Sequence, residues 1–351
     1  DREVTKTRQS VGVCDVSTLG KIDIKGKDAA EFLNKIYSNP FAKVPVGRVR
    51  YGLMLREDGI CYDDGTTARL AENHFVMTTT TANAVLVYRN MEFARQCLFP
   101  DLDVHIISTT DQWAQFAVAG PNSRAVLSKI IDNVDMSNDG FPFMACSDVT
   151  VCGGTPGRLF RISFSGELAY EVAVPARYGD ALIREIISAG EEFNITPYGT
   201  EALGVMRIEK GHVTGAELNG QMTAFNINMN NMISTKKDSI GSVLSRREVM
   251  VADDQVRLVG VKTIKKSDSI SSGAHFLAEN DKPTTQNDQG WITSVCYSPH
   301  FEQHIGLGFL ERGHERHGEV LRAWDGIRGT DVLVEIVSSH MYDPEGGLQR
   351  G

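Results

Sequence analysis

Apolar and polar residues alternate with a period of two over many short stretches of the chain, a pattern typical of β-strands that bury one face. Clusters of Gly, Asp, Asn and Pro separate these stretches and predict turns. Before residue 180 the pattern predicts strands at residues 18–25, 47–55, 60–70, 75–80, 104–108, 113–119, 149–152, 159–164 and 170–174. The second and third strands enclose the turn Glu57-Asp58-Gly59, which predicts a β-hairpin.

Other segments have the spacing and the end signals of helices. The helix that begins near Asp28 has Glu31 three residues later, as in a capping box, and Asn39-Pro40 ends it. The charged segment Asp1–Ser10 predicts a helix on the surface. The predicted helices cover residues 1–10, 28–39, 82–97, 121–131, 178–193 and 199–211.

The character of the chain changes near residue 254, where short strands and turns replace the mixture of helices and strands. A chain of 351 residues exceeds one ordinary core, so more than one domain is expected. We predict an α+β region over residues 1–250 and a β-barrel domain over residues 251–351. The barrel strands are predicted at residues 257–263, 291–294, 305–309, 320–324 and 332–337.

Composition narrows the function classes. A net charge of −9 argues against a surface for nucleic acids, which needs clustered Lys and Arg. No apolar run reaches the length of a membrane span, and the first residues do not resemble a signal peptide. The six cysteines are scattered without a CxxC pair, which predicts reduced thiols and a cytoplasmic protein. The chain begins at Asp1, as expected of a processed or trimmed chain, or of one part of a larger protein.

Two acids follow the turn Ser165-Gly166 in the stretch Gly157–Ala176. If the path there is extended, Glu167 and Glu171 share one face of a strand. A carboxylate held on a rigid strand can accept two N–H bonds from a flat heterocycle of the aminopyrimidine kind. Residue types alone leave a second interpretation open, an acid pair at an exposed strand end.

A second acid pair, Asp63 and Asp64, stands before Gly65 on the return strand of the predicted hairpin. Adjacent residues of a strand point to opposite faces, so at most one of the two acids can face any pocket. The alternative is that both acids decorate a turn or a strand edge.

Two further patterns do not predict ligand sites. The glycine cluster Gly153–Gly157 joins a strand to a strand, whereas a dinucleotide loop leads into a helix N-terminus. The pairs His300/His304 and His314/His317 lack the further ligands of a metal site, so we expect solvated histidines and no metal.

The amino-acid sequence of these stretches resembles that of the folate-binding aminomethyltransferase family, to which the T-protein of the glycine cleavage system belongs. The block RISFSGELAYE, around Glu167 and Glu171, is similar to the corresponding family block. The nearer likeness is to the folate domain of the α subunits of heterotetrameric sarcosine oxidases. That likeness runs through residues 17–39, 47–59, 75–81, 119–124, 139–144, 197–203 and 337–346.

The resemblance implies the three-lobed glycine cleavage T-protein fold with a C-terminal β-barrel. It also implies an enzyme that transfers one-carbon units to tetrahydrofolate. In a sarcosine oxidase, an oxidase site makes an iminium from sarcosine, and the folate domain forms 5,10-methylenetetrahydrofolate. No dinucleotide loop is present, so we expect any flavin or NAD site outside this chain, on oxidase subunits that would be its partners.

The resemblance also implies roles for five residues. Glu171 would anchor the pterin ring, and Asp64, by an ungapped match from Glu57 to Leu70, would act on the reacting nitrogen as the catalytic acid–base group. Tyr51, Glu167 and Arg207 would line the folate pocket. For Arg207 the alternative is a surface charge with helical neighbours.

Residues 211–247 depart from the family pattern. Thr223-Ala224-Phe225-Asn226 lacks the proline and the acid of a TPxD-like turn, and Asn231 stands where the relatives have a tryptophan. His212 replaces the cysteine of the KGCxxGQE motif of folate-binding iron–sulfur assembly proteins, which argues against that group. Two other functions therefore stay open: a free-standing aminomethyltransferase or demethylase, and a folate-binding subunit without catalysis.

Overall fold

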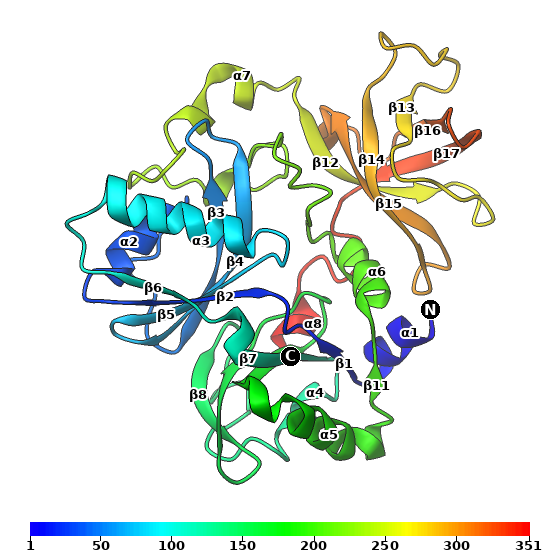
Figure 1. Cartoon of the computed structure of the whole chain (residues 1–351). Coiled ribbons are helices and arrows are strands. Elements are labelled where there is room, and N and C mark those ends of the chain that lie inside the picture. Colours follow the sequence, from blue (N-terminus) through cyan, green and yellow to red (C-terminus); the bar gives the residue numbers. More distant parts are fainter.

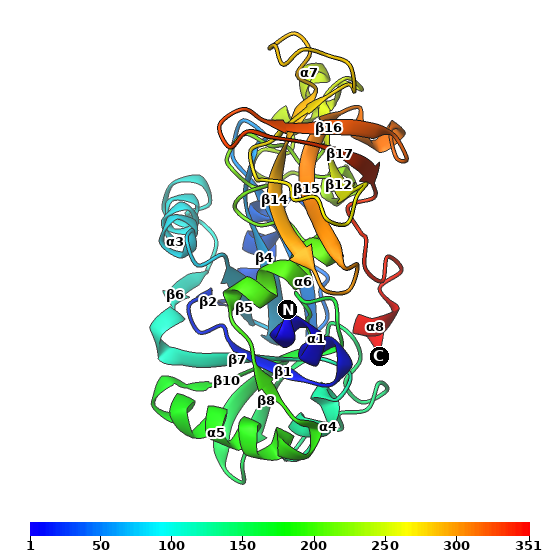
Figure 2. The same ribbon diagram turned by 90° about the vertical axis from the view of Figure 1, so that its right-hand side faces the viewer.

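Three β-sheets organise residues 1–351, all of which the computed structural model describes (Figure 1). The five-stranded sheet has the order β3-β4-β5-β2-β6, and the six-stranded sheet has the order β11-β1-β7-β10-β9-β8. The third sheet is a closed barrel of order β12-β15-β14-β13-β16-β17. The barrel and the six-stranded sheet lie at opposite ends of the molecule, as both views show (Figure 2).

The first two sheets are interleaved in sequence. The five-stranded sheet is built from β2 (Gly20–Lys25), β3 (Arg48–Leu55), β4 (Cys61–Ala71), β5 (His74–Thr79) and β6 (His105–Ser108). The six-stranded sheet takes one strand from before this block and the others from after it. Its strands are β1 (Gly12–Asp15), β7 (Trp113–Ala119), β8 (Cys146–Val151), β9 (Thr155–Phe160), β10 (Ala169–Pro175) and β11 (Thr196–Pro197).

Helices cover one face of each of these sheets. The five-stranded sheet packs Ile22 and Ile24 beneath α2 (Ala29–Ile36) and α3 (Ala84–Phe93), which a π-helical turn (Ala94–Leu98) extends. The six-stranded sheet packs Val172 and Val174 against α4 (Ser123–Leu127) and α5 (Gly179–Gly190). Because side chains alternate along a strand, the other faces of both sheets are free to pack on each other. They do so through Val49, Ala68 and Val76 on one sheet and Phe160 on the other, with Ile162 just after β9.

The barrel strands are β12 (Val256–Thr263), β13 (His275–Leu277), β14 (Gly290–Ser298), β15 (Gln303–Glu311), β16 (Val320–Asp325) and β17 (Thr330–Val337). Helix α6 (Thr200–Lys210) contacts β14 and β15 of the barrel and also α1 (Arg2–Gln9), so it lies at the junction of the lobes (Figure 2). Short helices α7 (Glu248–Val251) and α8 (Gly347–Arg350) complete the α-helices. Single 3₁₀ turns lie at Thr110–Gln112, Ala176–Tyr178, Glu191–Phe193, Asn230–Met232, Leu244–Arg246 and Gly313–Glu315.

The structure differs from the helices, strands and caps predicted from the sequence at four places. The strand expected at residues 159–164 ends at Phe160, and the helix expected over 121–131 covers only Ser123–Leu127. The Asp28 side chain does not cap its helix, because its carboxylate accepts a bond from the Asp103 backbone N–H instead. Helix α1 is not confined to the surface, since Val4 and Thr7 are buried beneath it.

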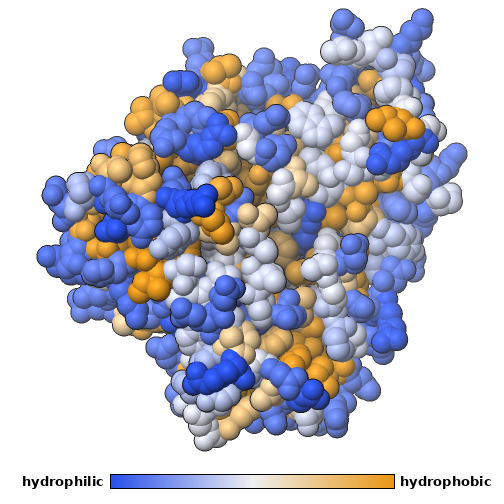
Figure 3. All heavy atoms as spheres, viewed as in Figure 1, coloured by the Kyte–Doolittle hydropathy of each residue, from blue (hydrophilic) through white to orange (hydrophobic).

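The surface seen in Figure 3 mixes hydrophilic and hydrophobic residues. No helix combines the length and the apolar character needed to cross a membrane. No three or more His, Cys, Asp or Glu side chains gather as they would around a metal ion.

Candidate functional site

The candidate site lies where the uncovered faces of the two sheets meet. Asp23 of β2 turns away from the apolar core beneath α2 and accepts two bonds from Arg158 of β9, at 3.0 and 2.7 Å. This buried pair joins the five-stranded sheet to the six-stranded sheet. Lys21, two residues before Asp23, therefore shares a face turned toward the six-stranded sheet.

Asp64 and Tyr51 belong to this inner face of the five-stranded sheet. The Tyr51 hydroxyl donates to Asp64 Oδ2 at 2.7 Å across the β3–β4 pair. The other oxygen, Oδ1, is buried and has no hydrogen-bond partner. Burial raises the pKa of Asp64 to about 7; the Tyr51 bond opposes the shift, and the charge of Asp63 adds to it. A carboxyl group with this pKa can both take and give a proton near neutral pH.

Asp63 points the other way, as the alternation of a strand requires. Its carboxylate accepts bonds from the Thr80 hydroxyl at 2.9 Å and the Asn83 amide at 3.0 Å, just before α3. The next residue, Gly65, lies so close to the neighbouring strand that a Cβ atom there would come within 2.0 Å of the Thr78 carbonyl oxygen. The Asp-Asp-Gly pattern thus combines a structural acid, an inward-facing acid and a close approach of two strands.

Glu171 occupies the facing sheet. Its neighbours Tyr170 and Val172 point into the core beneath α4 and α5, so Glu171 points toward the five-stranded sheet. The Gln115 amide donates to Glu171 Oε2. Burial raises the pKa of Glu171 to about 7, while the Gln115 bond and the positive charge of Lys21 oppose that shift.

A row of polar side chains runs across the five-stranded sheet from Lys21 to Asp64. Lys21 on β2 pairs with Thr78 on β5, whose hydroxyl lies 2.9 Å from that of Thr66 on β4. Asp64 follows two residues along β4 on the same face. Two strand spacings and two residues of rise place the Cα atoms of Lys21 and Asp64 about 12 Å apart. A ligand lying along this row could therefore contact both ends.

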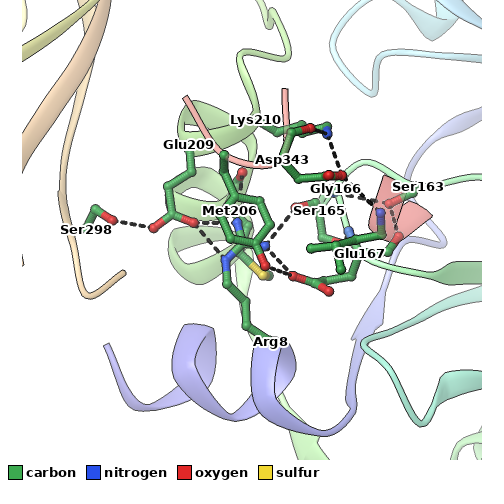
Figure 4. A network of polar contacts seen from close by, with 12 residues as sticks. Arg8, Ser163, Ser165, Gly166, Glu167, Met206, Glu209, Lys210, Ser298 and Asp343 are labelled. Carbon is green, nitrogen blue, oxygen red and sulfur yellow. Dashed lines mark hydrogen bonds and ion pairs between the residues drawn. The ribbon is translucent and has the colours of Figure 1, made fainter. Parts of the chain in front are cut away.

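Glu167 and Arg207 lie in ion pairs around α6, apart from this row. The chain bends at Gly166, which has a φ of +86°, so Glu167 does not continue the face of Glu171. Glu167 accepts bonds from Arg8 and from the Tyr342 hydroxyl, each at 2.6 Å, and Arg8 also binds Glu209 (Figure 4). We name Arg8, Glu167, Glu209 and Tyr342 the Arg8 clamp.

Arg207 is not a surface charge, because only 9% of it is exposed. Its guanidinium donates to Glu217 at 3.0 Å and to the Ser294 hydroxyl of β14 at 2.7 Å. These contacts tie α6 to the barrel. Arg207 and Glu167 stay predictions as folate-pocket residues, and their bonds within the protein account for their burial.

The segment that departs from the family pattern borders the site. Met229 Sδ lies 3.8 Å from the Tyr51 hydroxyl. Asn226 provides the acceptor that an acid would provide in this turn, since its Oδ1 accepts from the Thr223 backbone N–H at 2.9 Å and hydroxyl at 2.8 Å. The turn at residues 223–226 thus forms without the proline and the acid of the TPxD-like turn.

Three neighbours of the site were missed from the sequence: Lys21, Gln115 and Met229. Lys21 belongs to the alternating strand GKIDIK, and Gln115 interrupts the apolar strand WAQFAVA. Only 2% of Lys21 and 1% of Gln115 are exposed. A polar residue at an inward position of a strand is the signal that could have found them. Met229 approaches Tyr51 only through tertiary structure, so no local pattern indicates it.

Comparison with known proteins agrees with this architecture. Residues 1–237 match the GCVT N-terminal domain family, and residues 257–343 match the glycine cleavage T-protein C-terminal barrel domain family. A solved aminomethyltransferase T of the glycine cleavage system from Bartonella henselae superposes with a TM-score of 0.84 at 21% identity. The match covers 98% of this chain and 89% of that one, which confirms the predicted α+β, three-lobed fold with a C-terminal barrel.

Two kinds of relative match nearly the whole chain. The sarcosine oxidase subunit alpha of Rhizobium meliloti is 50% identical over 98% of this chain, and that of Corynebacterium sp. strain U-96 is 43% identical over 100%. The chain spans only 35% and 36% of the lengths of these two relatives. An aminomethyltransferase from Listeria welshimeri is 28% identical over 95% of this chain and 87% of its own length. The chain belongs to the glycine cleavage T-protein family, and the predicted resemblance to sarcosine oxidase α subunits is confirmed.

Proposed function

We propose that this chain transfers a one-carbon unit to tetrahydrofolate and forms 5,10-methylenetetrahydrofolate. The observation that carries the proposal is the pair of buried acids, Asp64 and Glu171, on facing sheets, each with a pKa raised to about 7. Buried carboxyl groups with shifted pKa values cluster at functional sites more often than elsewhere. The similarity to aminomethyltransferases and sarcosine oxidase α subunits supports the reaction class.

The residues present fit a folate. A buried carboxylate oxygen of Asp64 without a partner is matched by a ligand that carries N–H groups, and reduced folates carry several. Tetrahydrofolate would supply the nucleophilic nitrogen of the reaction. Glu171 would accept N–H bonds from the ring edge and so fix the orientation of the ring, with Gln115 holding its second oxygen in place.

Asp64, at the other end of the polar row, would act as the proton acceptor. Its Oδ1 atom, which is buried and has no partner, would accept a proton from a nitrogen that becomes cationic during the transfer, while Tyr51 holds Oδ2. The surrounding low dielectric strengthens the interaction between the carboxylate and the developing positive charge. Its contribution therefore belongs mainly to the transition state.

We further propose that the one-carbon unit comes from the iminium made by oxidation of an N-methyl amine such as sarcosine, on a flavin-carrying partner subunit. The support is the match to subunits about three times as long as this chain. The second candidate is a free-standing aminomethyltransferase, which the match over 87% of the Listeria welshimeri enzyme supports. Affinity purification from native cells separates the two. Co-purifying flavoprotein subunits support the first, and recovery without them supports the second.

The central test is calorimetric titration of the protein with tetrahydrofolate, followed by an assay of 5,10-methylenetetrahydrofolate formation from formaldehyde and glycine-derived iminium. Binding with turnover is the expected result. Binding without turnover would favour a non-catalytic folate-binding subunit. Absence of binding at about a millimolar ligand, with the protein folded, would overturn the proposal, because a dissociation constant above that corresponds to less than about 4 kcal/mol.

A further inference from the structure

Lys21 is a buried cation that no neighbouring carboxylate pairs with directly. Only 2% of the residue is exposed. Its ammonium donates to the backbone carbonyls of Ser17 at 2.8 Å and Leu19 at 3.0 Å. An ammonium carries three donors, so one N–H of Lys21 has no acceptor in the structure. A buried donor left without an acceptor is costly, which indicates that a ligand provides one.

Glu171 lies near Lys21 through a short chain of contacts. The Lys21 ammonium donates to the Ser17 carbonyl, the Ser17 hydroxyl accepts from the Gln115 backbone N–H at 3.0 Å, and the Gln115 amide donates to Glu171. Burial lowers the pKa of Lys21, and the charge of Glu171 opposes this effect. The reciprocal effect of Lys21 lowers the pKa of Glu171. The two side chains nevertheless form no ion pair, so a donor and an acceptor stand near each other at one end of the polar row, each with capacity left for a ligand.

A 2-amino-4-oxo pterin presents a complementary edge. Its exocyclic amine and ring N–H are adjacent donors, and the 4-oxo oxygen beside them is an acceptor. A carboxylate alone can accept from the two donors, and it loses one of them in a 4-amino ring, where N3 carries no hydrogen. It offers nothing to the oxo group itself. A cationic donor beside the carboxylate distinguishes the 4-oxo group from a 4-amino group. The donor bonds to the oxo oxygen, but it faces another N–H donor when an amine replaces the oxo group.

We propose that Lys21 is a specificity-determining residue, whose free N–H binds the 4-oxo oxygen of the pterin while Glu171 binds the adjacent donors. This inference rests on the proposed function, since it requires the ring to lie at Glu171. Lys21 thereby adds to the selection of 4-oxo folates over 4-amino-4-deoxy folates of the same oxidation state and tail.

The test compares two ligands in the same protein preparation. Calorimetry would measure the dissociation constants of tetrahydrofolate and of its 4-amino-4-deoxy counterpart with the unaltered protein, with Lys21→Met and with Lys25→Met. Lys25 lies on the same strand and face but is exposed, so it is the matched control. The unaltered protein and Lys25→Met should prefer the 4-oxo ligand by 10-fold or more. Lys21→Met should reduce that ratio at least 3-fold, and the preference that remains comes from Glu171 facing N3.

The ratio of the two constants separates specificity from folding. If Lys21 only braces the loop of Ser17 and Leu19, Lys21→Met weakens both ligands equally and the ratio is kept, which overturns the inference. Partial unfolding of the variant weakens the apparent binding of both ligands by the same factor, so it cancels in the ratio and any change in the ratio still reports on Lys21. Failure of the unaltered protein to bind either ligand would instead overturn the proposed function. Equal binding of both ligands by the unaltered protein would overturn the role of Lys21 alone.

Discussion

At the scale of single residues, burial decides the chemistry of the two acids. Glu171 is 8% exposed and the unbonded oxygen of Asp64 is enclosed, and the lack of solvent makes the charged form of each carboxyl costly. The same burial makes these positions unfavourable for stability at neutral pH. The site therefore combines a cost in folding free energy with groups that can exchange protons near pH 7.

The change Asp64→Asn should separate binding from catalysis. An amide keeps the shape of the side chain but cannot accept the proton, so we expect tetrahydrofolate affinity within about 3-fold of the original and a methylene-transfer rate lower by roughly 10²–10⁴. With Asp64 present, the rate should rise as pH increases through about 7, because the ionised form is the active one. A rate independent of pH between 6 and 8 in single-turnover measurements would contradict this role.

Asp64→Asn should also stabilise the protein, by about 1–2 kcal/mol at pH 8. The folded-state pKa of Asp64 is raised, so ionisation weakens folding as pH increases from near 4 to about 7. The gain should therefore vanish below pH 4. The matched variant Asp63→Asn should instead lose about 1–2 kcal/mol and keep its transfer rate, because it disturbs only the bonds to Thr80 and Asn83. Urea unfolding at several pH values measures both effects.

Glu171→Gln should weaken tetrahydrofolate binding by roughly 1.5–3 kcal/mol, the range for a hydrogen bond to a charged group. The amide removes the charge and replaces one acceptor oxygen with a donor. Calorimetry measures the change, with Glu185→Gln on the exposed side of α5 as the control. An equal effect of both substitutions would show that Glu171 does not contact the ligand.

At the scale of helices and strands, the sequence predicts a feature wherever that feature depends on residues close together in the chain. The hairpin of β3 and β4 follows from its alternation and its turn, and the opposite directions of Asp63 and Asp64 follow from strand geometry alone. The sequence predicts the turn at Ser165-Gly166 but not the direction of the Glu167 side chain. Glu167 binds Arg8 and Tyr342, which are remote in sequence. For the same reason the partners of Arg207 were not predictable, because both lie outside its helix.

The Arg8 clamp should be worth several kcal/mol. Arg8 is enclosed between Glu167 and Glu209, whose side chains are 4% and 0% exposed. Arg8→Met leaves both carboxylates buried without a counter-charge, so we expect a loss of about 3–5 kcal/mol in the free energy of unfolding. Arg184→Met, which breaks an exposed pair with Asp180, should change it by less than about 1 kcal/mol. Similar losses for the two variants in urea unfolding would contradict the clamp.

At the scale of the whole molecule, the division into residues 1–250 and 251–351 stays a prediction. The change in pattern near residue 254 indicates the barrel, but it carries no information on how firmly the barrel is attached. Arg207 and Ser294, and Glu209 and Ser298, join α6 to the barrel through buried polar bonds. The C-terminal segment also returns from the barrel to the other lobes, where Lys210 binds Asp343.

We therefore expect the chain to unfold as one cooperative unit. Differential scanning calorimetry should give a single transition, with equal calorimetric and van't Hoff enthalpies, because separating the barrel exposes buried charged groups. Saturating tetrahydrofolate at about 100 times its dissociation constant should raise the stability by about 2.7 kcal/mol without splitting the transition. Two resolved transitions would show that the barrel folds independently of α6.

The place of β1 has a consequence for synthesis on the ribosome. Residues 20–108 form the five-stranded sheet from one continuous stretch, whereas Gly12 of β1 pairs with Ala119 and Thr196. At roughly 5–20 residues per second, β1 waits about 5–20 s for the synthesis of β7, its first neighbour in the sheet. During that time the strand has unpaired edges and an apolar face, which is where chaperones bind and where chains aggregate. Within these residues, the five-stranded sheet is thus the first that can fold, and β1 joins the structure after it.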